Sequence, residues 1–213
     1  MNFAKKILFV LILFASLGTY AQTMLHPKIS GIGFHPFKTE NRSLFDENAI
    51  DANTQWIVEP GLMLSIETYI RGTQLSWRFM PGFYNDATAQ PALFFHLGLK
   101  LRLFRIYRSS LDIAIGPTYN FRETWTQWDG YVPEADYNLN GNWENMIYLL
   151  GELEYKFFLA DHWDITTSVM YGHSWQTFTF TLGVRYWLTT KIKHPIGCGS
   201  CPFDDTKYKS KRR

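Results

Sequence analysis

Residues 177–188 alternate between apolar and mostly polar side chains at every position. Even positions carry Phe, Phe, Leu, Val, Tyr and Leu, and odd positions carry Thr, Thr, Thr, Gly, Arg and Trp. Successive side chains of a β-strand point to opposite faces of the sheet. The segment therefore predicts a strand with one apolar face, and such a strand must pair with others.

Seven earlier segments show the same period of two. They lie at residues 28–37, 56–66, 74–83, 93–103, 111–122, 146–159 and 163–171, and the first is the least regular. Long polar connections at 38–55, 85–90 and 126–142 alternate with tight ones at 71–73, 108–110 and 160–162. An even number of strands joined alternately by tight turns and longer loops is typical of a transmembrane β-barrel.

The two faces fit a barrel in lipid better than a barrel in water. Eight strands enclose an interior that side chains just fill, and the apolar faces carry too many large residues to point inward. The polar faces carry equal numbers of acids and bases, as expected where each buried charge needs a partner. The predicted lumen residues are Glu59, Glu67, Arg78, Lys100, Arg102, Asp112, Arg122, Glu152, Glu154, Lys156, Asp164 and Arg185. We expect a plugged lumen without an open channel; a soluble lipid-binding barrel is the alternative.

Aromatic and proline residues add two expectations. Aromatic residues gather near the segment ends, which predicts two interfacial girdles. They are Trp56, Trp77, Phe83, Tyr119, Trp125, Trp143, Phe157, Trp163, Tyr171 and Trp187. Pro60, Pro81 and Pro117 lie inside predicted strands. Because proline lacks the N–H that a strand ladder uses, they predict bulges or positions near the barrel rim.

The chain divides into three parts. Residues 1–21 have the pattern of a secretory signal, since Lys5 and Lys6 precede an apolar run too short to span a bilayer. Cleavage is expected before Gln22, and the ending Tyr-Ala-Gln resembles signals of Bacteroidota. Residues 22–188 form the predicted barrel and 189–213 a tail. A formal net charge of +2 argues against nucleic-acid binding.

The end of the last predicted strand matches a known signal. Thr181, Gly183, Tyr186 and Leu188 have the spacing polar-x-Gly-x-x-aromatic-x-apolar, which resembles the C-terminal insertion signal of bacterial outer-membrane barrels. With the eight segments, the chain resembles the small eight-stranded outer-membrane proteins: the OmpA transmembrane domain and the OmpX and OmpW families. The resemblance implies an all-β, antiparallel up-and-down barrel in the outer membrane of a Gram-negative bacterium. It also implies contact with outer-membrane lipid and with the barrel assembly machinery. The tail departs from the resemblance, since many such barrels stop at the last strand. With the N-terminus on the periplasmic side, the even number of strands predicts that the tail lies in the periplasm.

The sequence offers little sign of catalysis. Lipid A deacylases carry a His and a Ser two apart on one strand face, whereas His173 and Ser174 are adjacent and would point to opposite faces. We therefore expect no catalytic residue, cofactor or metal. A lipid A-modifying hydrolase is kept as the alternative function.

Partner contacts are expected at both ends of the barrel. Trp125, Trp128 and Tyr131 make the third outer loop rich in aromatic residues, which favour protein contacts. The tail carries Cys198 and Cys201, expected to form a disulfide in an exported protein. It ends on bases that suit a partner protein or anionic headgroups: Lys207, Lys209, Lys211, Arg212 and Arg213. The function expected is a non-enzymatic scaffold or accessory subunit of a larger outer-membrane assembly or secretion complex.

Overall fold

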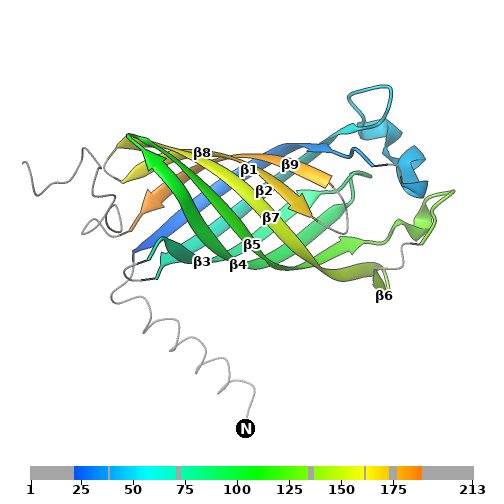
Figure 1. The fold of residues 1–213 in the computed structure, drawn as a ribbon. Coiled ribbons are helices and arrows are strands. Elements are labelled where there is room, and N and C mark those ends of the chain that lie inside the picture. The colour runs from blue at the N-terminus through cyan, green and yellow to red at the C-terminus, as the bar shows by residue number, and fades with distance from the viewer. Residues whose placement is uncertain are drawn as a thin grey trace, which may run out of the picture.

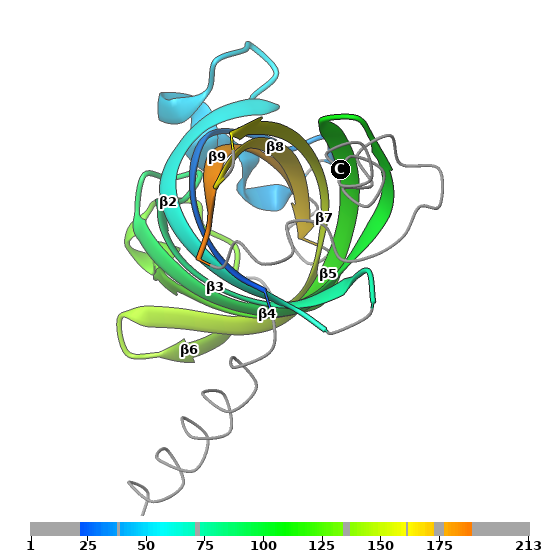
Figure 2. The same ribbon diagram turned by 90° about the vertical axis from the view of Figure 1, so that its left-hand side faces the viewer.

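Eight long antiparallel strands close into one barrel (Figures 1 and 2). The computed structural model describes residues 22–37, 39–70, 73–133, 137–160, 162–172 and 177–188. The barrel strands are β1 (Thr23–Phe34), β2 (Trp56–Tyr69), β3 (Leu75–Asn85), β4 (Pro91–Ile106), β5 (Ser109–Glu123), β7 (Trp143–Ala160), β8 (Trp163–Gly172) and β9 (Thr177–Trp187). Strands adjacent in the chain pair with each other, and β1 pairs with β9 to close the ring. The predicted fold class is confirmed.

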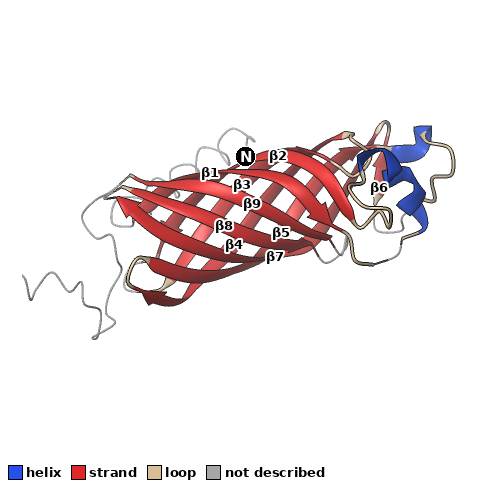
Figure 3. Ribbon diagram, turned by 90° about the horizontal axis from the view of Figure 1, so that it is seen from above, coloured by secondary structure: helices blue, strands red, loops and turns tan. Residues whose placement is uncertain are grey.

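Two of the long polar connections contain short regular elements. Residues 38–55 include the 3-10 helix η1 (Glu40–Asn48), and residues 126–142 include most of η2 (Trp125–Gln127) and the strand β6 (Asn138–Asn140). These elements lie together at the long-loop end of the barrel (Figure 3). The start of β1 and the end of β9 lie at the opposite, short-turn end (Figure 1). The predicted signal peptide and tail lie outside the described residues.

The bounds predicted for the first strand are wrong, and a bulge explains why. The strand was expected at 28–37, but β1 runs from Thr23 to Phe34. Its register shifts between Ser30 and Ile32 on both neighbouring strands. Before the shift Lys28 faces the lumen, and after it Gly33 does. A bulge adds a residue to one strand, so no single period of two fits this segment.

The outer wall of the barrel is apolar and the inner wall carries the charges. On β4, Leu93, Leu97 and Leu101 are exposed while the intervening Phe94, Gly98 and Arg102 are buried. An exposed apolar surface that encircles the whole molecule is far larger than a water-soluble monomer tolerates. It matches the apolar band that a transmembrane barrel presents to lipid. No helix in the described residues is long and apolar enough to cross a membrane.

The three strand prolines have different surroundings. Pro60 lies at the bulge, between the pairs Ser30–Gly61 and Ile32–Val58, as predicted. Pro81 and Pro117 lie in mid-strand with no register shift, so the prediction of a bulge or rim position is wrong for these two. Each has one neighbouring strand against which the pairing is interrupted, β2 for Pro81 and β4 for Pro117. The missing N–H falls at that interruption.

Gly116, next to Pro117, allows a close approach of β4 and β5. A Cβ atom at residue 116 would lie 2.1 Å from the Leu97 carbonyl oxygen and 2.5 Å from the Gly98 Cα. We expect Gly116→Ala to lower the free energy of unfolding by about 1–3 kcal/mol, because backbone atoms must move apart. Urea unfolding in detergent micelles measures this change.

Gly151→Ala is the matched control, since its new Cβ would meet nothing closer than 4.0 Å. An equal loss of stability in both variants would contradict the steric explanation.

Candidate functional site: the filled lumen and its outer cap

The lumen contains a layer of buried charges. All twelve side chains predicted to face the lumen are buried, none more than 8% exposed. Two further charged side chains, Lys28 and Glu144, are buried with them. Lys28 was missed because of the bulge in β1, and Glu144 was assigned to a loop because the sixth segment was expected to begin at residue 146. Lys28 is a base and Glu144 is an acid, so the numbers of acids and bases in the lumen stay equal.

Two glutamates of β7 form the centre of this layer. Lys28 Nζ lies 2.5 Å from Glu152 Oε1 and 2.6 Å from Glu154 Oε2. Lys100 Nζ lies 2.5 Å from Glu154 Oε1 and 2.7 Å from Glu67 Oε1. Arg78 pairs with Glu152 as well. These bonds join β7 directly to β1, β3 and β4 across the lumen, where no backbone pairing connects β7 to those strands. Glu67 of β2 joins the network through Lys100.

The short-turn end of the lumen is closed by aromatic and charged side chains. Asp164 pairs with Arg185 and accepts a hydrogen bond of 2.8 Å from Trp187 Nε1. The Trp187 ring stacks on Tyr69 with ring centres 6.1 Å apart, and Arg102 donates to the Tyr69 hydroxyl. Trp187 was expected in the lipid-facing girdle, but it is 2% exposed and plugs the lumen instead.

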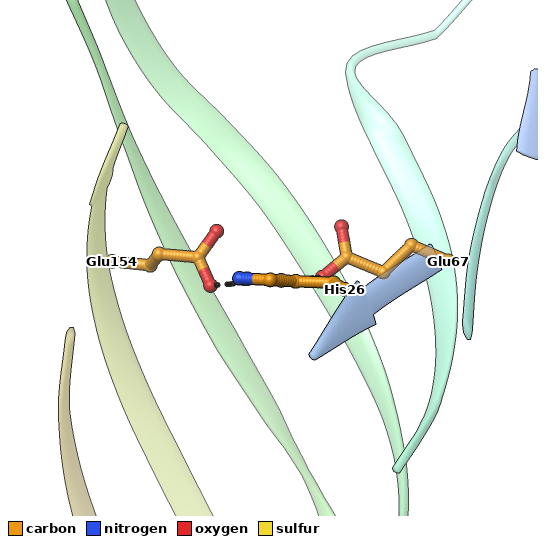
Figure 4. Close-up of side chains that lie close together, drawn as sticks. All are labelled: His26, Glu67 and Glu154. Atoms are coloured by element: carbon orange, nitrogen blue, oxygen red, sulfur yellow. Dashed lines mark ion pairs between the residues drawn. The ribbon is translucent and has the colours of Figure 1, made fainter. Parts of the chain in front are cut away.

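One cluster in the charged layer has the composition of a metal site. Ligand atoms of His26, Glu67 and Glu154 all lie within 4.8 Å of one another (Figure 4). The same carboxylates already bind the ammonium groups of Lys28 and Lys100. A cation placed here would meet two fixed positive charges. His26 Nε2 instead hydrogen-bonds to Thr166 at 2.7 Å, so the cluster is part of the ion-pair network.

Nearer the long-loop end, the lumen becomes apolar. Methionine and aromatic side chains pack there in one cluster, which the sequence analysis did not predict. It contains Met63, Met80, Tyr84, Ala92, Phe94, Met146, Tyr148, Leu150 and Met170. The sign was present in the sequence, because these residues share the parity of the charged residues. A cavity of about 40 Å³ lies beside this layer, roughly enough for a few waters.

Beyond the apolar layer, three loops of the long-loop end pack into a cap. Phe45 of η1 contacts the Trp125 ring edge-on with ring centres 5.8 Å apart. The Asn41 side chain donates to the Val132 carbonyl oxygen at 2.9 Å and accepts from its N–H at 2.8 Å. Trp125 Nε1 donates to Asp86 at 2.7 Å. Buried apolar contacts and hydrogen bonds thus fix the loops to one another.

Of the three aromatic residues expected to contact a partner, two are packed into the cap. Trp125 is 3% exposed and belongs to the core of the cap. Tyr131 is half-buried, packs against that core and donates to Glu144 at 3.0 Å. Trp128 alone of the three is exposed, at 37%.

Two loops of the cap share one local structure. In each loop an aspartate carboxylate accepts hydrogen bonds from the backbone N–H groups two and four residues ahead. The two loop sequences are Asp51-Ala-Asn-Thr-Gln and Asp86-Ala-Thr-Ala-Gln. The fourth residue of each has positive φ, 52° at Thr54 and 61° at Ala89. Hydrogen bonds, first that from Trp56, lower the pKa of exposed Asp51. Burial raises the pKa of Asp86 to about 6 despite similar bonds.

A hydrogen-bonded chain joins the outer ends of β9, β1 and β2. The Thr177 hydroxyl lies 3.0 Å from His35 Nδ1, and His35 Nε2 lies 3.1 Å from Glu59 Oε1. Gly33 leaves room for this carboxylate, since a Cβ there would lie 2.0 Å from Glu59 Oε2. The Phe45 ring covers His35 with ring centres 5.5 Å apart. The three polar groups satisfy one another beneath the cap.

The remaining predicted residues are placed as follows. Of the insertion signal, Thr181 faces the lumen, Gly183 is buried, Tyr186 is half-buried and Leu188 is exposed. His173, Ser174, the cysteine pair and the basic residues of the tail lie outside the described residues.

The fold is similar to solved small barrels. The N-terminal barrel domain of Pseudomonas aeruginosa OprF aligns at 11% identity and a TM-score of 0.49, over 78% of this chain and 98% of that one. Neisserial surface protein A aligns at 6% identity and a TM-score of 0.46, over 78% of this chain and 96% of that one. A designed transmembrane β-barrel aligns at 9% identity and a TM-score of 0.47, over 78% of this chain and 95% of that one. No protein-family model and no curated protein matches the sequence.

The apolar outer wall and the charged lumen define the class of this chain as a small transmembrane β-barrel. The Bacteroidota source stays a prediction.

The charged layer predicts a large effect of Glu154→Gln. The change removes a carboxylate bonded to Lys28 and Lys100 and leaves two buried ammonium groups with less compensation. Breaking a buried ion pair costs about 3–5 kcal/mol, and we expect a loss of this size in the free energy of unfolding. Glu47→Gln, at an exposed position of η1, is the control and should change little. Equal stabilities of the two variants would disprove the central role of Glu154.

The two aspartate loops predict opposite pH dependences. Because the folded-state pKa of Asp86 lies above its ordinary value of 3.8, its contribution to stability decreases as pH rises from about 4 to about 6. The Asp86→Asn variant lacks this decrease. The free energy of unfolding of the variant, relative to that of the unchanged protein, should therefore rise with pH over this range. The folded-state pKa of Asp51 is lowered, so the relative stability of Asp51→Asn should fall as pH rises. Urea unfolding between pH 3 and 7 measures both, and slopes of the same sign would contradict the assignment.

Proposed function

We propose that this chain is a sealed outer-membrane barrel that acts as an accessory or scaffold subunit of a larger assembly, through surfaces at its two ends. The observation that carries the proposal is the filled lumen. Charged, apolar and cap layers follow one another along the barrel axis, and the retained cavity is about 40 Å³. A barrel filled in this way is poorly suited to transport, which leaves its surfaces as the places where it acts.

The structure of the cap supports an interaction role at the outer end. Its loops are fixed by hydrogen bonds and buried side chains, so a partner would meet a surface that loses little conformational entropy on binding. Phe37, Ile50, Trp128 and Val132 are exposed on these loops, each at 37% or more. Aromatic residues with a free face are enriched where proteins bind each other.

At the other end, the proposal includes the basic residues of 207–213 in the periplasm. The up-and-down order supports this placement, because both ends of the barrel segment lie at the short-turn end and short turns are periplasmic in outer-membrane barrels. The terminal signal that includes Gly183 and Tyr186 supports insertion by the barrel assembly machinery.

Photocrosslinking in cells tests the accessory role. A photoreactive residue in place of Trp128 and another in place of Lys209 are expected to give discrete crosslinked species larger than the barrel. Ile165 is the matched control, since it lies in the lipid-facing wall at 40% exposure. Only uncrosslinked monomer from residues 128 and 209 would contradict the proposal, and a stable large conductance in planar bilayers would contradict the sealed lumen.

A lipid A-modifying hydrolase is the second candidate. The specific observation in its favour is the Thr177–His35–Glu59 chain, which has the order hydroxyl, imidazole, carboxylate used in nucleophilic catalysis. Against it, Thr177 is 4% exposed and the adjoining cavity has no room for an acyl ester. Mass spectrometry of lipid A with and without the protein distinguishes the two candidates.

A further inference from the structure

One face of the β6–β7 hairpin carries a distinct group of side chains. Trp143 pairs with Asn140 of β6 on one side and with Glu123 of β5 on the other. Asn145, which shares this face, pairs with β6 and β5 in the same way. The two rows are Glu123, Trp143 and Asn140, and Phe121, Asn145 and Asn138. Directly opposed residues have Cβ atoms about 4.5–5.5 Å apart, so the six form one continuous group, which we name the Trp143 patch.

Within the described residues, the polar side-chain groups of the Trp143 patch have no structural partners. Trp143 is 43% exposed, and Asn138 and Asn140 are exposed as well. None of the three asparagines, Glu123 or the Trp143 indole N–H makes a side-chain hydrogen bond within the described part of the chain. On the opposite face of the same strands, Arg122 donates to Glu144 at 2.8 Å. The inner face therefore uses its polar groups to hold the structure, and the outer face leaves them available.

The hairpin leaves the barrel wall at the long-loop end. Pairing between β7 and β8 stops at Leu150 and Gly172, and beyond this point β6 takes the place of β8 beside β7. Figure 2 shows β6 outside the ring of barrel strands. The Trp143 patch continues the lipid-facing wall through Ile147, which is 72% exposed, and Tyr119. In the orientation of the proposed function, on which this inference rests, the patch lies at the level of the outer headgroups, where barrels place aromatic residues.

The chemistry of the Trp143 patch fits a sugar ring. An indole ring offers a flat apolar surface for the C–H face of a pyranose. Each asparagine side chain supplies two N–H donors and an acceptor, and ionised Glu123 supplies acceptors only, which together match the hydroxyls at the ring edge. The patch contains no Lys or Arg, so it is poorly suited to phosphate or sulfate. A tryptophan that only anchors the barrel at the interface would need neither three amides nor a carboxylate.

We propose that the Trp143 patch is a saccharide-binding site. Its ligand is a hydroxyl-rich sugar, carried by a glycolipid headgroup of the outer leaflet or by a free glycan. Trp143 stacks on the sugar, and the side chains of Asn140, Asn145 and Glu123 bond to its hydroxyls.

Isothermal titration calorimetry on the full chain in detergent micelles tests the proposal. The probes are the lipid-free core oligosaccharide of lipopolysaccharide, intact lipopolysaccharide, and lipid A, which lacks the core. Trp143→Ala is expected to weaken saccharide binding about tenfold or more, as for a central aromatic contact, and Asn140→Leu to weaken it less. Trp163→Ala is the matched control, because Trp163 is similarly exposed, at 46%, at the short-turn end. Heat-modifiable gel mobility verifies that each variant is folded, and Asn140→Leu, in an exposed hairpin, tests the site if Trp143→Ala does not fold.

Each outcome decides the question. Loss of binding to both the free oligosaccharide and intact lipopolysaccharide supports recognition of the saccharide itself. Loss restricted to intact lipopolysaccharide supports a headgroup held in the membrane. Equal binding of all variants, or binding of lipid A as tight as that of intact lipopolysaccharide, would overturn the proposal in favour of simple membrane anchoring.

Discussion

The ion pairs across the lumen are the interactions on which the rest of the structure depends. Backbone pairing joins each strand only to its two neighbours, whereas Glu152 and Glu154 bind side chains from the opposite wall. Such charges are costly to bury unless each has a close partner. The barrel can therefore carry them only in one arrangement, and this requirement ties the register of β7 to that of β1 and β4.

The apolar layer and the cap follow from the same constraint. A charged layer needs protection from ions and water if its pairs are to keep their strength. Met63, Phe94 and Tyr148 provide a dry layer on the long-loop side, and Tyr69 with Trp187 closes the short-turn side. Because the cap is held by its own buried contacts, side chains on the exposed surfaces of the loops and of the β6–β7 hairpin do not contribute to the packing of the lumen.

Much of the barrel was predictable because period two is a local property. Alternation in 93–103 and 163–171 placed two strands and their lumen faces without any knowledge of partners. The failures have physical causes. A bulge reversed the parity within β1, so Lys28 was missed. Tryptophan is typical of membrane interfaces, so Trp125 and Trp187 were expected there. Both are buried, because their burial depends on residues that only the tertiary fold places around them.

The sequence by itself determined the strand number, the up-and-down order and which face of most strands is apolar, because each of these depends on neighbours in the chain. The tertiary structure alone decided which charges pair, how the lumen is layered, and that Glu123 of β5 lies beside Trp143 of β7. Those relations join residues that are far apart in sequence. Their contacts arise from register and ring closure, which a local pattern cannot encode.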